Sequence, residues 1–259
     1  MVSLFAILAA VLHLGAGILL VSDLRREGDG MRAVARFAAD AALVSLGLLG
    51  TVVLVSQGAI GLLRASQVGI ALAMVLGAGT WALRFKASLR PIAVITLPLC
   101  GLLLLFSAFE SQRPLVEDGG VSPLILVHIG LVLVGLGSFG LGSALSGLYL
   151  IQEHQLRRRS FGPLFQRLPS LEELDAASFR LVCLGFVAFS VAILLGGIAG
   201  ATLDARIALS ALAWICFAAV LHTRLMSGWR GRASAWMTVV GFGVALVAVS
   251  TYVFAGGAG

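Results

Sequence analysis

Eight long apolar stretches, separated by short connections, are the feature that most limits how this chain can fold. We place them at about 2–22, 36–56, 66–84, 91–109, 122–151, 178–202, 206–225 and 234–256. A helix needs about 20 apolar residues to cross a hydrocarbon core about 30 Å thick, and these stretches have about that length. The sequence therefore predicts an all-α fold, a polytopic transmembrane helix bundle of about eight spans.

The composition leaves no room for a separate soluble domain. Hydrophobic residues make up 59% of the 259 residues and charged residues 12%, and no polar stretch is long enough to bury a core of its own. We therefore expect a single integral membrane domain over 1–259. Because the N-terminus lacks a positively charged n-region and an obvious cleavage site, we interpret Val2 to Val21 as a retained span and not as a removed signal.

The net charge of +6 follows membrane topology and does not indicate nucleic-acid binding. Fifteen of the 18 basic residues fall in the connections after the first, third, fifth and seventh stretches. They are Arg25, Arg26, Arg32, Arg36, Arg84, Lys86, Arg90, Arg157, Arg158, Arg159, Arg167, Arg180, Arg224, Arg230 and Arg232. Basic loops remain in the cytoplasm, so we predict that both termini lie outside. We also expect Asp40 to pair with Arg36, four residues before it.

Two local patterns concern helix ends and helix packing. Pro169, Ser170 and Glu173 form a capping box, which predicts a helix start and a short amphipathic lead-in at the membrane interface. In the fifth stretch, which is long enough to protrude from the lipid, Ser138, Gly142 and Ser146 recur at intervals of four. Such small residues let another backbone or a flat ligand approach closely, and helix packing is the commoner role.

Three histidines lie within predicted spans and are candidates for function, because polar groups in the hydrocarbon core are costly. These are His13 in the first, His128 in the fifth and His222 in the seventh. A neutral imidazole offers a lone pair to iron without adding charge, and two histidines from different helices can hold haem iron axially. We propose His13 and His222 as such a pair; the alternative for each is a hydrogen bond to a neighbouring helix.

The remaining candidates point away from ordinary enzymes. The cysteines Cys100, Cys183 and Cys216 lie in apolar runs without a CxxC pair, which indicates buried hydrophobic side chains. There is no phosphate-binding glycine loop, serine nucleophile elbow or HExxH motif. Arg224 and the basic turns could contact haem propionates, although anchoring the topology is the commoner role. Trp214 is the tryptophan that we expect in a pocket.

Two segments resemble a known family. LPSLEELDAASFRLVCLGF and AWICFAAVLHTRLMSGWRGRASAWMTVVGF look like the C-terminal half of the cytochrome c assembly family, of the CcsA/CcmC type with its HemX-like branch. The resemblance covers about 122–256. It implies that His128, in LILVHIGLVLVGLGSFG, faces an outer haem site, and that His222, in VLHTRL, is an embedded haem ligand.

The chain also departs from that family. Its best-known members carry a tryptophan-rich outer segment, whereas the corresponding connection here is GATLDARIA, and a second outer histidine is absent. These departures favour the HemX-like branch, with haem b as the cofactor of a multi-pass protein of the bacterial inner membrane. Any attachment of haem to cytochrome would then require a second cytochrome c assembly membrane protein to supply the outer site.

Three functions remain open from the sequence, none of them catalytic in the strict sense. The first is a haem-binding membrane protein that assists cytochrome c biogenesis. The second is a membrane regulator of haem synthesis that binds a cytoplasmic partner, such as a haem-synthesis enzyme, through Arg157 to Arg167. The third is a permease or transporter subunit for another small solute, with structural histidines.

Overall fold

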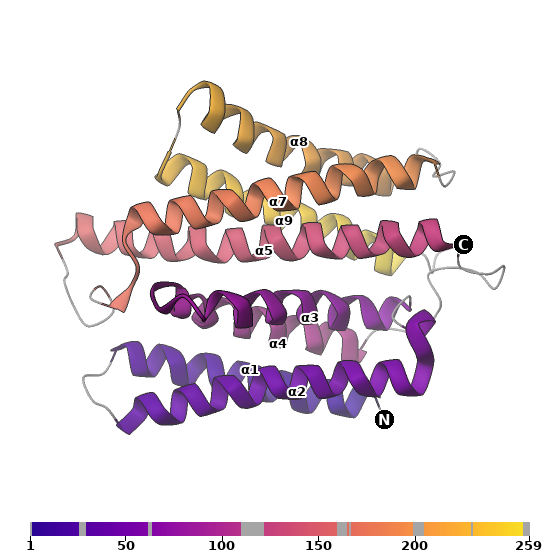
Figure 1. Ribbon diagram of the computed structural model, residues 1–259, viewed down its shortest axis with the longest axis horizontal. Helices are drawn as coiled ribbons and strands as arrows, with labels where there is room; N and C mark the ends of the chain where they lie inside the picture. Colours follow the sequence, from indigo (N-terminus) through magenta and orange to yellow (C-terminus); the bar gives the residue numbers. More distant parts are fainter. Residues whose placement is uncertain are drawn as a thin grey trace. The chain divides into compact units, whose positions relative to one another are not determined.

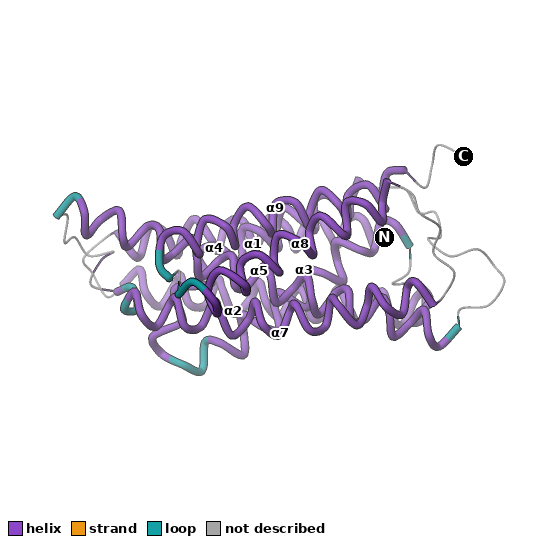
Figure 2. The backbone as a smooth tube through the Cα atoms, turned by 90° about the horizontal axis from the view of Figure 1, so that it is seen from above, coloured by secondary structure: helices purple, strands orange, loops and turns teal. Residues whose placement is uncertain are grey.

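The computed structural model describes residues 2–25, 30–61, 64–109, 122–159, 165, 167–198, 205–228 and 230–255. Within these residues the regular elements are helices, as Figure 1 and Figure 2 show. They are α1 (Val2–Arg25), α2 (Gly30–Gly61), α3 (Ala65–Leu83), the 3-10 helix η1 (Ala87–Ile92), α4 (Ala93–Phe109), α5 (Pro123–Arg157), α7 (Leu171–Ile198), α8 (Ala205–Met226) and α9 (Arg232–Ala255). The predicted all-α class is confirmed.

Seven of the described helical segments are long and apolar enough to cross a membrane, so the chain is a multi-pass membrane protein. They belong to α1, α2, η1 with α4, α5, α7, α8 and α9. The remaining predicted span corresponds to α3, whose apolar part, Gln67–Leu83, is shorter. At 1.5 Å per residue this part measures about 25 Å, somewhat less than the hydrocarbon core.

Two predicted segments differ in extent from the helices that form. The fifth is confirmed as long, because α5 has 35 residues and measures about 52 Å. The predicted helix start near Ser170 is also confirmed, since α7 begins at Leu171. The lead-in, however, continues into the span as one helix, and its Leu174 is fully buried. The apolar side of this lead-in is thus covered in part by the protein itself, and its position at the membrane interface stays a prediction.

The chain divides into two compact units. Unit 1 comprises Met1–Pro114 and Ile151–Ser170, and unit 2 comprises Leu115–Leu150 and Leu171–Gly259. Unit 1 thus contains α1 to α4, and unit 2 contains most of α5 together with α7, α8 and α9.

In unit 1, close helix contacts depend on small residues and on polar bonds between helices. Gly17 of α1 lies against the ring of Pro98 in α4, where an added Cβ would be 2.5 Å from Cγ. Thr80 of α3 donates a 2.9 Å hydrogen bond to the hydroxyl of Thr96 in α4. The thiol of Cys100 is buried and bonds to the carbonyl of Ala73. Cys100 is therefore a buried packing residue, as predicted.

Gly69 of α3 provides a test of this packing. A Cβ at Gly69 would lie 2.5 Å from the carbonyl oxygen of Leu103 and against the Ser107 hydroxyl. We expect Gly69→Ala to destabilise the protein by about 1–3 kcal/mol through overpacking. Gly15→Ala is the matched control, because its Cβ meets nothing within 4 Å. Thermal unfolding in detergent measures both; equal midpoints for the two variants would contradict this packing.

Unit 2 is centred on Phe139 of α5. Its ring stacks on Phe217 of α8, with centroids 3.5 Å apart, and meets the edge of Phe189 in α7 at 5.9 Å. Gly185 of α7 makes room for the same ring, since an added Cβ would lie 2.7 Å from it. Phe139 thereby joins three helices of unit 2.

Candidate functional site

His222 lies on the outward face of α8. The exposed side chains of that helix include Ala208, Ala211, Leu212, Ile215, His222 and Leu225. Ala208, Leu212 and Ile215 follow at intervals of four and three, and His222 lies seven residues, or about two turns, after Ile215, so these positions share one stripe. Because α8 is a candidate membrane span, His222 presents an imidazole on a face that is otherwise apolar. No hydrogen bond of its ring is found among the described residues.

Arg224, two residues further on, faces the interior of unit 2. Its guanidinium binds the carboxylate of Asp175 in α7 through two bonds, of 2.8 and 2.6 Å, and lies 4.2 Å from the ring centre of Phe179. The Gly231 amide donates a 3.4 Å bond to the same carboxylate. This group ties the end of α8 to the starts of α7 and α9, so Arg224 acts as an internal clamp and its guanidinium is not free for a propionate.

Asp175 is the residue in this region that sequence reasoning missed. It carries no partner at helical spacing in its own segment, and its arginine is 49 residues away. The only sequence signal was an acidic residue at the start of an apolar helix. Such a residue is usually attributed to the helix dipole.

His128 of α5 is half-buried against α7. Its Nδ1 lies 2.7 Å from the carbonyl oxygen of Ala192. Gly196 supplies space for the ring, because a Cβ there would lie 2.9 Å from Cε1 of His128. A carbonyl only accepts hydrogen bonds, so Nδ1 carries the proton and the lone pair resides on Nε2. Such a tautomer is the one that a metal-binding histidine with a second hydrogen bond adopts.

The part of α5 that follows His128 in the chain also packs against α7. Gly142 approaches the backbone of Ser178, whose hydroxyl donates a 2.9 Å bond to the Gly142 carbonyl. The hydroxyl of Ser146 lies 2.9 Å from that of Ser178. The small residues therefore serve helix packing, which was the commoner of the two predicted roles.

His13 of α1 lies in the core of unit 1 and is fully buried. Its Nδ1 lies 2.7 Å from the carbonyl oxygen of Ala9 in the same helix. Its Nε2 is buried and has no hydrogen-bond partner among the described residues. By the reasoning given for His128, this Nε2 carries a lone pair, and it is a buried polar atom that a ligand would satisfy.

The three histidines occupy separate places. In unit 2, His128 adjoins Ala192 while His222 lies near the Asp175 end of α7. Ala192 lies 17 positions after Asp175, which corresponds to about 25 Å along the helix, so one iron cannot bind both side chains. His13 belongs to unit 1 and His222 to unit 2, and their pairing stays a prediction.

Two further residues singled out in the sequence are Trp214 and Asp40. Trp214 is half-buried, donates a 2.8 Å hydrogen bond to Ser190 and packs on Phe186 at 5.2 Å. Asp40 pairs with Arg84 of the neighbouring helix end, which corrects the expected pair with Arg36. Among the described residues no group of three or more His, Cys, Asp or Glu side chains could hold a metal.

Comparison with known proteins gives a consistent result over almost the whole chain. The family model described as "Cytochrome C assembly protein" matches residues 1–254. This match extends well beyond the segment, from about 122, that carries the resemblance in the sequence.

Individual relatives are more distant. Protein HemX of Brevibacillus brevis is 30% identical over 153 residues, which cover 56% of this chain and 56% of that protein. Cytochrome c biogenesis protein CcsA of Synechococcus sp. (strain CC9902) is 31% identical over 160 residues, covering 51% and 52%. CcsA of Guillardia theta is 25% identical over 187 residues, covering 62% of each chain. The matches thus span about half to three fifths of these relatives' lengths, and no solved structure matches.

Proposed function

The chain belongs to the cytochrome c assembly protein family, and from that premise we propose that it binds haem within the membrane and hands it on during cytochrome c biogenesis. The observation that carries this proposal is the position of His222. A polar side chain in the hydrocarbon core costs free energy, so a histidine there is a candidate for function. The imidazole of His222 is exposed on an apolar stripe of α8, which is a candidate membrane span. A flat, apolar ligand with a metal centre would satisfy both the ring and the stripe.

In this proposal His222 is an axial ligand of haem iron, and the porphyrin lies along the outward stripe of α8. Iron in haem has two axial positions that neutral imidazole nitrogens occupy. Near the same end of the helix, Arg230 is exposed and is suited to bind a propionate, since Arg224 is held by Asp175. The chain's own contribution is to bind and orient haem, without a catalytic group.

His128 and His13 enter the proposal as further haem-binding residues. Each bonds through Nδ1 to a carbonyl, which leaves an Nε2 lone pair available. For His128 we propose contact with haem at the opposite end of unit 2 from His222, on the outer side. For His13 we retain the axial role beside His222; because the ring is fully buried, iron would reach it only after unit 1 opens.

The physiological setting is part of the same proposal. We assign haem b as the ligand, the bacterial cytoplasmic membrane as the location, and both termini to the outer side. A second assembly protein of the membrane is the partner that would receive haem and attach it to the cytochrome.

Deleting the gene for this chain tests the function. We expect loss of c-type cytochromes, seen by haem staining of gels, while b-type haem proteins and haem precursors stay at normal levels. Re-expression of the intact chain should restore the stain. Normal c-type cytochromes in the deletion strain would contradict a role in their assembly.

One observation favours a second function, regulation of haem synthesis through a partner. Arg157, Arg158 and Arg159 at the end of α5 are all exposed, although part of the predicted surface, 160–164 and 166, lies outside the described residues. Clustered cations of this kind attract an acidic protein surface. Replacing the three arginines by glutamate should then change haem precursor levels; unchanged levels would remove this alternative.

A further inference from the structure

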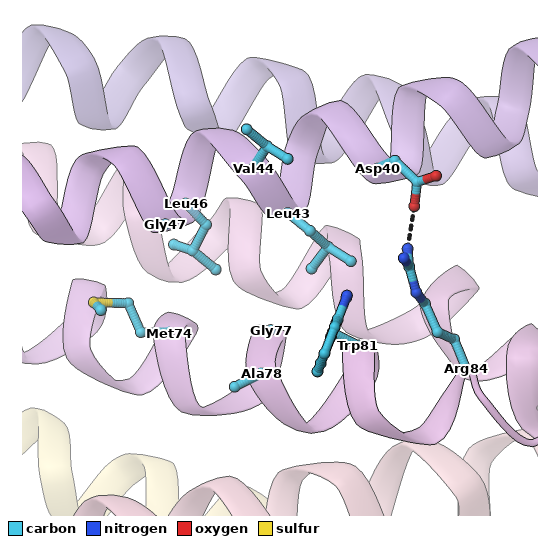
Figure 3. Close-up of a pocket in the computed structure, with 10 residues that line it drawn as sticks. All are labelled: Asp40, Leu43, Val44, Leu46, Gly47, Met74, Gly77, Ala78, Trp81 and Arg84. Atoms are coloured by element: carbon cyan, nitrogen blue, oxygen red, sulfur yellow. Dashed lines mark hydrogen bonds and ion pairs between the residues drawn. The ribbon is translucent and has the colours of Figure 1, made fainter.

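A groove between α2 and α3 in unit 1 has the dimensions of a ligand site. Its volume is about 510 Å³, within the range of about 300–1,000 Å³ found for small-molecule sites. Gly47 of α2 and Gly77 and Ala78 of α3 are among the residues that line it, as Figure 3 shows. Gly77 lets Leu46 of α2 approach closely, whereas a Cβ at Gly47 would meet nothing within 4 Å, so Gly47 leaves the groove open.

The groove is apolar along its length and charged at one end. Met74 lies towards one end and Arg84 at the other, where Arg84 binds the carboxylate of Asp40 (Figure 3). Arg90 adds a second cation there, since its Nε donates a 3.2 Å bond to the Arg84 carbonyl. Two cations and one carboxylate therefore lie at this end of the groove, which leaves one positive charge in surplus.

The position of the groove fits one leaflet of a bilayer. Arg84 lies ten positions after Met74, which corresponds to about 15 Å, or about half of a hydrocarbon core about 30 Å thick. Trp81, which is 49% exposed, lies at the charged end, as interfacial tryptophans do. The groove thus has apolar walls about as long as one leaflet is thick, with cations at one end. A phospholipid has the matching arrangement, an apolar acyl chain that ends in a charged phosphate.

We propose that this groove binds one anionic glycerophospholipid, with the phosphate at Arg84 and Arg90 and an acyl chain along Gly47 and Ala78. This goes beyond the proposed haem function, because it involves neither the histidines nor unit 2. The bound lipid fills the open space beside Gly47, between α2 and α3.

Native mass spectrometry of the full chain, released from nanodiscs, tests the proposal. Phosphatidylglycerol and phosphatidylethanolamine serve as competing probes. We expect one phosphatidylglycerol per chain, with about fivefold preference, since a basic residue near anionic lipid contributes about that factor. Gly47→Leu should abolish this retention, because a side chain there points into open space. Gly15→Leu, also in open space but away from the groove, should retain the lipid.

The ion pair of Asp40 and Arg84 gives a second test, because removing the acidic and the basic partner should change phosphatidylglycerol retention in opposite directions. Asp40→Asn removes the only acidic group at the rim among the lining residues and should raise phosphatidylglycerol retention. Arg84→Gln should lower it. Equal effects of the two variants, equal retention of both lipids, or retention in Gly47→Leu would each overturn the proposal. The visible spectrum of the same samples reports haem separately, so failure of either idea is recognised without the other.

Discussion

Replacing His222 with alanine is expected to lower the yield of c-type cytochromes by about tenfold or more, which is the scale of losing support for a metal. The reason is that an exposed imidazole on the apolar stripe of α8 is the proposed iron ligand. Because the side chain points outward, its removal leaves the packing of unit 2 unchanged. Haem staining measures the yield, and an immunoblot shows that the variant accumulates.

Two further variants make this prediction specific. His154→Ala is the control, because His154 is exposed in the last turn of α5 and should be dispensable. His222→Met should retain part of the activity, since a thioether also binds haem iron. Wild-type yields from His222→Ala would contradict the proposed role of this residue.

The second large effect concerns the clamp of Asp175 and Arg224. The Asp175→Ala variant leaves the Arg224 side chain, which is only 9% exposed, without its carboxylate partner. Removing one partner of a buried pair costs about 3–5 kcal/mol. We therefore expect a clear fall in the thermal midpoint of the purified protein, with faster proteolysis near Gly228, in the turn between α8 and α9.

The double variant Asp175→Ala with Arg224→Met should recover much of that loss, because no unpaired charge then remains buried. Arg157→Gln is the matched control. Arg157 pairs with Glu153 but is 63% exposed, and exposed pairs contribute about 0–1 kcal/mol. If the Asp175→Ala variant has the same thermal midpoint as the wild type, the pair of Asp175 and Arg224 does not contribute to the stability of the folded protein.

The helices could be predicted from sequence because length and hydropathy are properties of each segment alone. The capping residue Ser170 likewise marked the start of α7 at Leu171. Ion pairs were less accessible. Spacing indicated Arg36 as the partner of Asp40, whereas the structure uses Arg84, since a neighbouring helix is invisible to the i,i+4 rule.

The helix that carries each histidine could be predicted, but the direction in which its side chain points could not. His13 is buried in the core and His222 faces outward, although both lie in apolar helices. When every face of a helix is apolar, no stripe in the sequence indicates which side turns inward. The contacts of His128 with Ala192 and Gly196 were hidden for a related reason, because they join segments more than 60 residues apart.

The most direct measurement is the visible absorption spectrum of the chain purified from haem-replete cells, beside its His222→Ala variant. We predict a Soret band in the wild-type protein and its loss in the variant, with His154→Ala unchanged. A colourless wild-type protein, or a band that persists at full strength in His222→Ala, would contradict haem binding at α8.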